Sequence, residues 1–250
     1  MTHVILTCYF TTTIDPMNRE ISQANNGHIP NDNFDMIKKL YLSIIKLKLN
    51  CVIFHDNLSN EFVKKYQNNY VSFYRVSTDN YKDRSINDTR FILYYDYLLT
   101  HHYDKICITD AFDVVFIKNP FTFIDKDNFL YGCAEGNKDG DFLTIKKSDW
   151  ICIRYNKAYH TDITKDMKLH LNKQAVNAGV LGGTYNTMIL LLKGINNDLM
   201  IVDKSVNSNM AVVNKIAYEL FDNNMLLGPP FCTKFKKLER NRTDCYIRHK

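Results

Sequence analysis

The feature that most constrains this chain is a regular alternation of apolar and amphipathic segments over its first 118 residues. We expect, in chain order, strands at 2–10, 50–55, 71–76 and 105–109, and helices at 33–49, 60–67 and 86–101. This alternation is typical of a parallel sheet with crossover helices. Because the strand segments are continuously apolar, the sheet should be covered on both faces. The sequence therefore predicts an α/β fold with a mainly parallel central sheet flanked by helices.

The second half of the chain has a less regular pattern. We expect the 105–109 strand to continue through 111–117, and we expect further strands at 129–134 and 141–145, a helix or strand at 150–157, a strand or helix ending at Leu192, and a helix at 209–221. No segment has the composition of a linker, and the sequence contains no internal repeat. We therefore predict a single domain over 1–250.

Composition excludes several classes of protein. The net charge is +5, and the basic residues are scattered except for the short runs Lys234–Lys237 and Arg240–Arg242. A nucleic-acid binder concentrates its basic residues on one face, so we expect no nucleic-acid partner. The two runs fit a solvated tail, with a phosphate contact as the alternative. The glycine-rich phosphate motifs of dinucleotide-binding and P-loop proteins are absent from the sequence.

The cysteines and the apolar segments indicate a compartment. Seven cysteines, without Cys-x-x-Cys spacing, favour neither a disulfide framework nor a zinc site, and indicate a reducing environment. The apolar stretches are short or interrupted by polar residues, so we expect no transmembrane segment. No Lys or Arg precedes Val4, which argues against a signal peptide. We predict a soluble, cytoplasmic protein.

Two aspartates at a strand end form the strongest local signal. Asp110 and Asp113 lie within the otherwise apolar segment Ile106–Phe116. Ionised carboxylates in such surroundings are unfavourable unless they are paired or hold a cation. Two hard oxygen ligands suit Mg²⁺ or Mn²⁺, which take phosphate oxygens and water as further ligands. The alternative is a surface turn whose aspartates face solvent.

Three further segments carry candidate binding groups. The glycines of Asn177–Gly183 allow backbone to approach a ligand, although a tight strand-to-helix turn would show the same pattern. Arg90 lies at a predicted helix start, where it is suited to reach a phosphate or to orient a carboxylate. The alternative is that this segment is a plain helix cap, and the two interpretations are compatible. His249 and Lys250 could complete a metal site and meet a diphosphate, whereas a disordered tail is the alternative.

Together these segments resemble GT-A-type glycosyltransferases over nearly the whole chain. Thr109–Phe116 looks like the DxD-like metal motif of the glycosyltransferase domains of procollagen lysyl hydroxylases, where two residues separate the aspartates. Asn177–Gly183 is similar to the sugar-side loop of the superfamily. The strand end Tyr9–Thr11, followed by Asp15, is similar to its base-binding first loop. The resemblance implies a GT-A (Rossmann-like) fold.

The resemblance also implies an activity and its residues. It implies a metal-dependent glycosyltransferase that moves a sugar from a nucleotide-diphospho-sugar, with a UDP-sugar expected, to a glycan, protein or small-molecule acceptor. The nucleotide would occupy about 1–118, and the sugar and acceptor about 119–250. Mn²⁺ or Mg²⁺ would be held by Asp110, Asp113 and His249. The residues implied to bind the donor are Tyr9, Phe10, Thr11, Arg90, Asp110, Asn177, Gly182, Gly183 and Lys250.

The chain departs from the family at one catalytic position. Many relatives carry an acidic residue, as in an Asp-Gln pair, where this chain has Val206–Met210 without a carboxylate. The amide of Asn209 cannot accept a proton at useful pH. The local alternatives for this acid are Glu135, Asp139 and Asp141, and the catalytic residues expected are Asp113, Arg90, Asp139 and Asp141. Inversion and retention both stay open.

Two other functions fit the same residues. A non-catalytic nucleotide-sugar binding module would explain the missing carboxylate at 206–210. A sugar-1-phosphate nucleotidyltransferase is the weaker alternative, because the first loop, Thr11–Asp15, lacks the glycines and arginine that a triphosphate requires.

Overall fold

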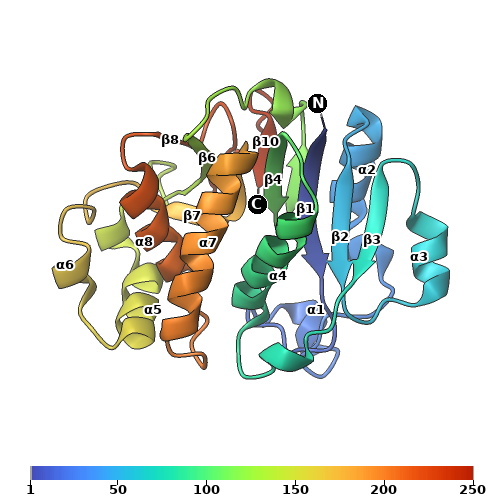
Figure 1. Cartoon of the computed structure of the whole chain (residues 1–250), viewed down its shortest axis with the longest axis horizontal. Coiled ribbons are helices and arrows are strands. Elements are labelled where there is room, and N and C mark those ends of the chain that lie inside the picture. Colours follow the sequence, from blue (N-terminus) through green and yellow to red (C-terminus); the bar gives the residue numbers. More distant parts are fainter. Residues whose placement is uncertain (1, 250) are drawn as a thin grey trace.

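The computed structural model describes residues 2–249, apart from the side chain of Lys237, and places most strands in one sheet (Figure 1). The strand order of this eight-stranded sheet is β3-β2-β1-β4-β7-β6-β8, and β9 pairs with β6. Its strands are β1 (His3–Tyr9), β2 (Cys51–His55), β3 (Val71–Arg75), β4 (Lys105–Thr109), β6 (Leu130–Glu135), β7 (Val176–Thr184), β8 (Met225–Leu227) and β9 (Lys234–Phe235). A second, two-stranded sheet pairs β5 (Val114–Phe116) with β10 (Ile247–His249).

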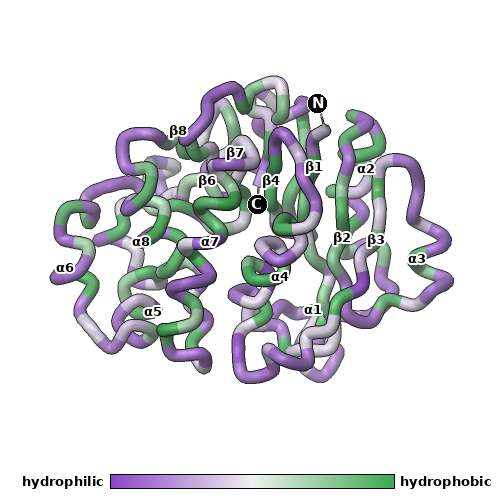
Figure 2. Tube along the Cα trace, viewed as in Figure 1, coloured by the Kyte–Doolittle hydropathy of each residue, from purple (hydrophilic) through white to green (hydrophobic). Residues whose placement is uncertain are grey.

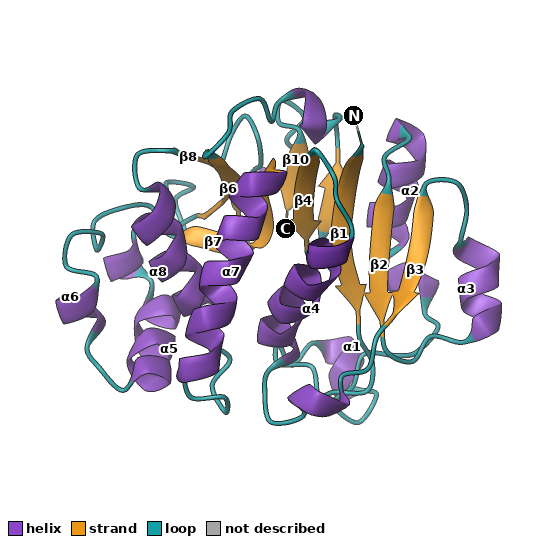
Figure 3. Ribbon diagram, viewed as in Figure 1, coloured by secondary structure: helices purple, strands orange, loops and turns teal. Residues whose placement is uncertain are grey.

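Eight α-helices connect and cover the strands in the described part of the chain. They are α1 (Glu20–Gln23), α2 (Lys38–Leu47), α3 (Asn60–Tyr66), α4 (Ile86–Thr100), α5 (Asp149–Tyr159), α6 (Ile163–Asp166), α7 (Tyr185–Ile201) and α8 (Asn209–Phe221). Helix α7 packs against α4 and α8, and α8 packs against α5. Figure 3 shows α4, α7 and α8 in front of the sheet and α2 behind it.

The predicted alternation of strands and helices in the N-terminal half is confirmed. Strands β1, β2, β3 and β4 pair in parallel, and Leu6 of β1 lies between Val52 and Ile108 of its neighbours. Successive side chains of a strand point to opposite faces. Leu6 therefore packs in the core beneath α4, while Ile5 packs in the other core, beside α2. Burial on both faces explains why these strands are continuously apolar, which Figure 2 shows as green traces between purple loops.

The sheet is mainly parallel, with one reversed strand. Strand β7 runs antiparallel to both β4 and β6, whereas β6 pairs in parallel with β8 and β9. The first residues of β7 therefore lie at the edge where β1 and β4 end. In Figure 3 the arrowheads of β1, β2 and β3 point to this edge, near α1. A mixed α/β single domain with a mostly parallel sheet was the predicted class, and it is confirmed.

The segment 111–117 does not continue β4, contrary to the prediction. Thr109 is the last β4 residue paired with β7, and the chain then bends between Asp110 and Asp113. It resumes as β5, which packs against α2 and pairs antiparallel with β10. The apolar run is thus divided between two sheets. It is continuous in the sequence because the strands on both sides of the bend are largely buried.

Two other predictions in the second half were wrong. Residues 141–145 form no continuous strand: Phe142 and Thr144 make only isolated bridges, to Gly136 and Gln174, after a turn in which the Asn137 side chain accepts hydrogen bonds from the backbone N–H groups of Asp139 and Asp141. The segment 177–183 belongs to strand β7 and is not a loop or a strand-to-helix turn. The ambiguous segments at 150–157 and before Leu192 are helical, within α5 and α7, and the helix at 209–221 is confirmed as α8.

Two further properties complete the fold. Among the described residues, every helix is too short or too polar to cross a membrane. All seven cysteines are free thiols, five of them buried.

Candidate functional site

The candidate site lies where β4 ends and β7 begins. Asp110 follows β4 directly, and its backbone N–H donates to the carbonyl of Gly179 in β7 at 2.8 Å. Because β7 is reversed, its residues Asn177–Gly179 stand at the ligand-binding edge of the sheet. In open α/β sheets ligands bind beyond the carboxyl ends of the parallel strands, which is this edge.

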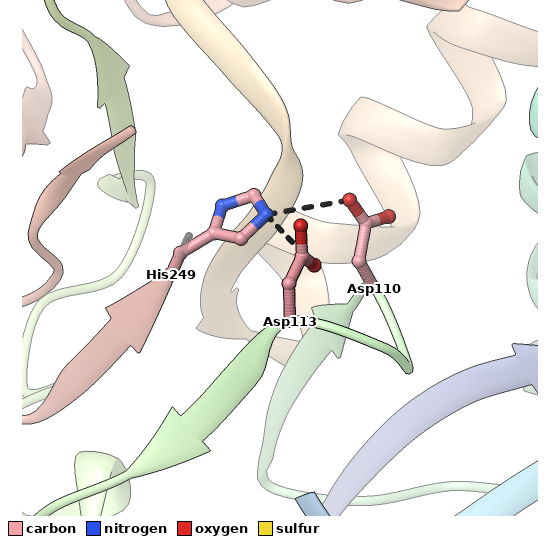
Figure 4. Close-up of side chains that lie close together, drawn as sticks. All are labelled: Asp110, Asp113 and His249. Atoms are coloured by element: carbon pink, nitrogen blue, oxygen red, sulfur yellow. Dashed lines mark ion pairs between the residues drawn. The ribbon is translucent and has the colours of Figure 1, made fainter. Parts of the chain in front are cut away.

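Three side chains that are distant in the sequence converge there (Figure 4). Nε2 of His249 lies 3.4 Å from Oδ2 of Asp110 and 3.4 Å from Oδ1 of Asp113. The candidate ligand atoms of the three residues all lie within 4.8 Å of one another. His249 is 1% exposed, and neither of its ring nitrogens has a hydrogen-bond partner. A buried imidazole without hydrogen bonds, beside two carboxylates, is a donor set that fits a hard divalent cation.

The chain end that carries His249 is docked, so the alternative of a disordered tail does not hold for residues up to 249. His249 pairs with Val114 across the small sheet. Its backbone N–H donates to Oγ1 of Thr233 at 2.9 Å, and the Thr233 hydroxyl donates to its carbonyl at 3.2 Å. The ring of Phe235 lies 4.5 Å from the imidazole, centroid to centroid. These contacts fix the backbone of His249 and place one aromatic ring against its imidazole.

The site favours positive charge. Burial alone would raise the pKa of Asp110, but the guanidinium of Arg90 and the imidazole of His249 hold it well below its ordinary value. Burial alone would lower the pKa of His249, but Asp110 and Asp113 offset this and raise it to about 10. In the absence of a metal, an imidazolium therefore supplies the cation that two carboxylates require.

Arg90 orients a carboxylate, which is one of the two roles expected for it. The side chain is buried in α4, and Nη1 donates to Oδ1 of Asp110. Nη2 donates to the carbonyl of Ala178 at 3.1 Å. Pairing with Asp110 raises the pKa of Arg90 above its ordinary value, although burial opposes this. Both terminal nitrogens are thus engaged within the protein, and Oδ2 of Asp110 stays turned toward His249.

A glycine makes room for the three side chains. A Cβ on Gly179 would overlap Cε1 of His249 and Oδ2 of Asp110, and would lie 2.9 Å from Oδ1 of Asn177. That Asn177 oxygen accepts the backbone N–H of Gly179 at 2.7 Å. The Asn177 amide nitrogen donates to Oε1 of Glu135 at 2.6 Å. Gly179 is therefore the residue that allows backbone to approach the candidate metal site.

A cavity of about 400 Å³, which we call the central cavity, opens beside this cluster. Its polar lining includes Asp110, Asp113, Glu135, Asn177, Asn209 and Lys236. Burial raises the pKa of Glu135, although the Asn177 hydrogen bond opposes the shift. A smaller cavity of about 50 Å³, the side cavity, continues from it toward Phe10 and Phe112. The two cavities share Asp110 and Arg90 in their lining.

Several residues expected to bind a donor are not brought to the cavities. Tyr9 is fully buried, and its hydroxyl donates to the carbonyl of Pro30 at 2.6 Å. The backbone N–H of Thr11 donates to Asp56, whereas Phe10 does line the side cavity. Tyr9 points away because side chains alternate along β1, and its face belongs to the core beside α2.

Gly182 and Gly183 lie inside the sheet, away from the ligand edge. They pair with Cys107 and Ile106 of β4, several residues before Asp110. A Cβ on Gly183 would meet the side chain of Thr187 at 2.9 Å. These two glycines therefore serve close packing, and Gly179 takes the place that was expected for them.

Asp139 and Asp141 are exposed in the turn organised by Asn137, and neither lines the central cavity. Glu135, which ends β6, does line it. Lys250 lies outside the described residues.

Arg19 lines both cavities but was not identified from the sequence, because its only signal there is that a basic residue lies four positions after Asp15.

The sheet order, the reversed β7 and the acidic edge define a mixed α/β fold with a candidate divalent-cation site. Among solved structures the chain is similar to the galactosyltransferase LgtC, determined in complex with donor and acceptor sugar analogs. The TM-score is 0.51, with 13% identity, covering 99% of this chain and 86% of that chain. An active-site mutant of LgtC gives a TM-score of 0.49 at 12% identity, over the same shares.

At this level of identity the likeness shows the fold alone, a mixed α/β domain with a mostly parallel central sheet. No protein-family model matches the sequence, and no curated protein does. The similarity of Thr109–Phe116 to procollagen lysyl hydroxylases stays a prediction.

Proposed function

We propose that the protein is a metal-dependent glycosyltransferase that uses a nucleotide-diphospho-sugar. A UDP-sugar is the expected donor, Mn²⁺ or Mg²⁺ the cation, and a glycan, protein or small molecule the acceptor. The observation that carries this proposal is the convergence of Asp110, Asp113 and His249 beneath Gly179, on a GT-A-type fold.

Asp110, Asp113 and His249 would hold the cation. When bound, a divalent cation acts as a Lewis acid and stabilises the charge that develops on a departing nucleoside diphosphate. Arg90 fixes the Asp110 carboxylate through its own hydrogen bond, so the ligand geometry is preorganised. We therefore assign Arg90 a positioning role and Asp113 a metal-binding role.

Asn177 and Glu135 would face the sugar and its acceptor. The start of α8, where an acid was expected, offers no carboxylate of its own, and Ser208 there donates both its N–H and its hydroxyl to Asp88. Glu135 lines the central cavity, and burial raises its pKa, which makes its carboxylate a better base. We propose Glu135 in place of Asp139 and Asp141 as the proton acceptor for an incoming hydroxyl.

The test of this function is a thermal-shift panel of UDP-, GDP-, CMP- and dTDP-sugars, each with and without Mn²⁺. A ligand that binds only the folded state raises its stability by RT ln(1 + [L]/Kd). We expect one class of nucleotide to give a metal-dependent shift. Asp113→Ala should abolish the metal dependence, and Asp127→Ala, which removes an exposed aspartate on a distant turn, should preserve it. If Mn²⁺ increases the nucleotide-induced thermal shift of Asp113→Ala as much as that of the wild type, the metal assignment is wrong.

A non-catalytic nucleotide-sugar binding module is the second candidate, because α8 begins without a carboxylate. Release of UDP from UDP-sugar over a long incubation separates the two functions. An enzyme releases UDP with Mn²⁺, and Glu135→Gln slows the release while nucleotide binding is kept. A module binds the donor and releases none.

A further inference from the structure

The central and side cavities share four residues, Arg19, Asn87, Arg90 and Asp110, which we call the neck. A ligand that occupies both cavities must pass between these side chains. We place the donor sugar in the central cavity; the side cavity, of about 50 Å³, is too small for a nucleoside, so the diphosphate lies at the neck and the nucleoside beyond it. The charged side chains of the neck therefore determine whether a nucleoside monophosphate or a nucleoside diphosphate binds there more tightly.

One of the two guanidinium groups at the neck is already engaged. Arg90 is 6% exposed, and both of its terminal nitrogens donate to protein oxygens, on Asp110 and Ala178. It positions Asp110, and although its Nε has no hydrogen-bond partner, its side chain is only 7% exposed, so little of the guanidinium is open to a ligand. A phosphate at the neck would therefore be met by a more exposed cation.

Arg19 has the required geometry. Its side chain is 36% exposed, and Nη1 donates to Oδ1 of Asp15 at 2.5 Å. Asp15 is itself held by the backbone N–H groups of Met17 and Arg19 and by the hydroxyl of Ser22. Within the described part of the chain, Nε and Nη2 of Arg19 donate to no protein acceptor. The guanidinium carbon also lies 5.1 Å from the centre of the Phe112 ring, which supports its orientation.

The Asp15 contact fixes Arg19 without occupying all of its donors. Burial alone would raise the pKa of Asp15, but its hydrogen bonds and the Arg19 charge lower it, so the pair stays ionised. A guanidinium presents five N–H donors in a planar fork, so one edge can bind a carboxylate while another binds a phosphate.

We propose that Arg19 is the protein cation that binds the donor diphosphate, and that it selects nucleoside diphosphates over monophosphates. This inference rests on the proposed function. A cation held at Asp110 and the Arg19 guanidinium, which both line the neck, would provide two positive groups, one for each phosphate. A nucleoside monophosphate would leave one of them without a partner.

The experiment measures the affinities of UDP, UMP and uridine in the presence of Mn²⁺ by calorimetry. Charge-assisted hydrogen bonds to phosphate are strong, so we expect Arg19→Ala to weaken UDP binding about tenfold. We expect UMP to lose about threefold or less and uridine to be unchanged, so that the UDP/UMP ratio falls. Arg19→Lys should retain part of the UDP affinity, because it keeps the charge but not the fork.

Two further variants distinguish diphosphate binding from a general effect of charge or of folding. Lys204→Ala removes a cation from an exposed pair with Asp83 and should leave all three affinities unchanged. If Arg19→Ala lowers the melting temperature, Arg19→Gln, which can still donate to Asp15, replaces it. Equal losses for UDP and uridine, or no loss for UDP, would overturn the role of Arg19 while the proposed function stands. Wild-type protein that binds no nucleoside diphosphate would overturn both.

Discussion

At the scale of single residues, the site depends most on a position without a side chain. Gly179 leaves the space in which His249 and Asp110 approach each other, and an added Cβ would overlap both of them. We predict that Gly179→Ala lowers Mn²⁺-dependent UDP affinity at least about tenfold, because the cation ligands must move apart. Calorimetry with and without Mn²⁺ measures this effect.

The matched control is Gly182→Ala on the same strand. There a Cβ would meet Ile124 and Phe231 in the core at 3.2 Å, so we expect a lower melting temperature but an unchanged metal dependence. The reverse result, with Gly179→Ala retaining the dependence on Mn²⁺, would show that the backbone approach at Gly179 has no part in cation binding.

At the scale of elements, His249 is positioned by the segment that precedes it. The Thr233 hydroxyl bonds to both backbone groups of His249 and is itself fully buried. Thr233→Val keeps the shape of the side chain but leaves these groups without a partner, at a cost of about 1–3 kcal/mol. We predict a loss of roughly three- to tenfold in Mn²⁺-dependent UDP affinity with the fold retained, measured by calorimetry and circular dichroism.

Thr100→Val is the control for that substitution, since it removes a hydroxyl bound to a carbonyl near the end of α4, far along the chain from the site. Affinities that fall equally in both variants would mean that Thr233 acts only through general stability.

The elements that could be predicted are those whose own residues carry a clear hydrophobic pattern. Strands β1 and β2 are long apolar runs, so the N-terminal sheet could be derived from periodicity. Strand β7 contains Gly179, Gly182 and Gly183, which weaken strand propensity, and only its pairing with β4 and β6 makes it a strand. Strand β10 has three residues, too few for any periodicity, and exists through its contact with β5.

The same distinction applies to the site. Asp110 and Asp113 could be identified from the sequence because they are acidic residues within an apolar run. Glu135 was not distinguished from Asp139 and Asp141, because the turn made by Asn137 exposes the latter two only in three dimensions. Tyr9 was misplaced since the face of a strand residue depends on which helix covers it.

At the scale of the whole molecule, one buried carboxyl group links stability to pH. Burial raises the pKa of Asp88 to about 6, although hydrogen bonds from Ser208 oppose the shift. Because the folded protein takes up this proton at a higher pH than the unfolded chain, protonation stabilises the fold, and this stability is lost as pH rises through about 6. Between about pH 7.5 and about pH 4.5 the gain is about 2 kcal/mol.

We predict that Asp88→Asn removes this contribution. The difference in free energy of unfolding between variant and wild type, from urea titrations, should favour the variant by about 2 kcal/mol more at about pH 7.5 than at about pH 4.5. Other titrating groups are common to both proteins and cancel in the difference. A difference independent of pH would contradict the assignment to Asp88.

The small sheet of β5 and β10 has a consequence for hydrogen exchange. Asp113 precedes β5 and His249 ends β10, so a cation held by both would tie the two strands together at one end. Separating the strands would then require release of the cation, and the free energy of this local opening would rise with metal concentration. The amides of Val115 and Arg248, which face each other across the two strands, should exchange more slowly as Mn²⁺ is added, while those in the middle of β2 keep their rates. The exchange rates of these backbone amides would thus measure how much of the protein holds a cation.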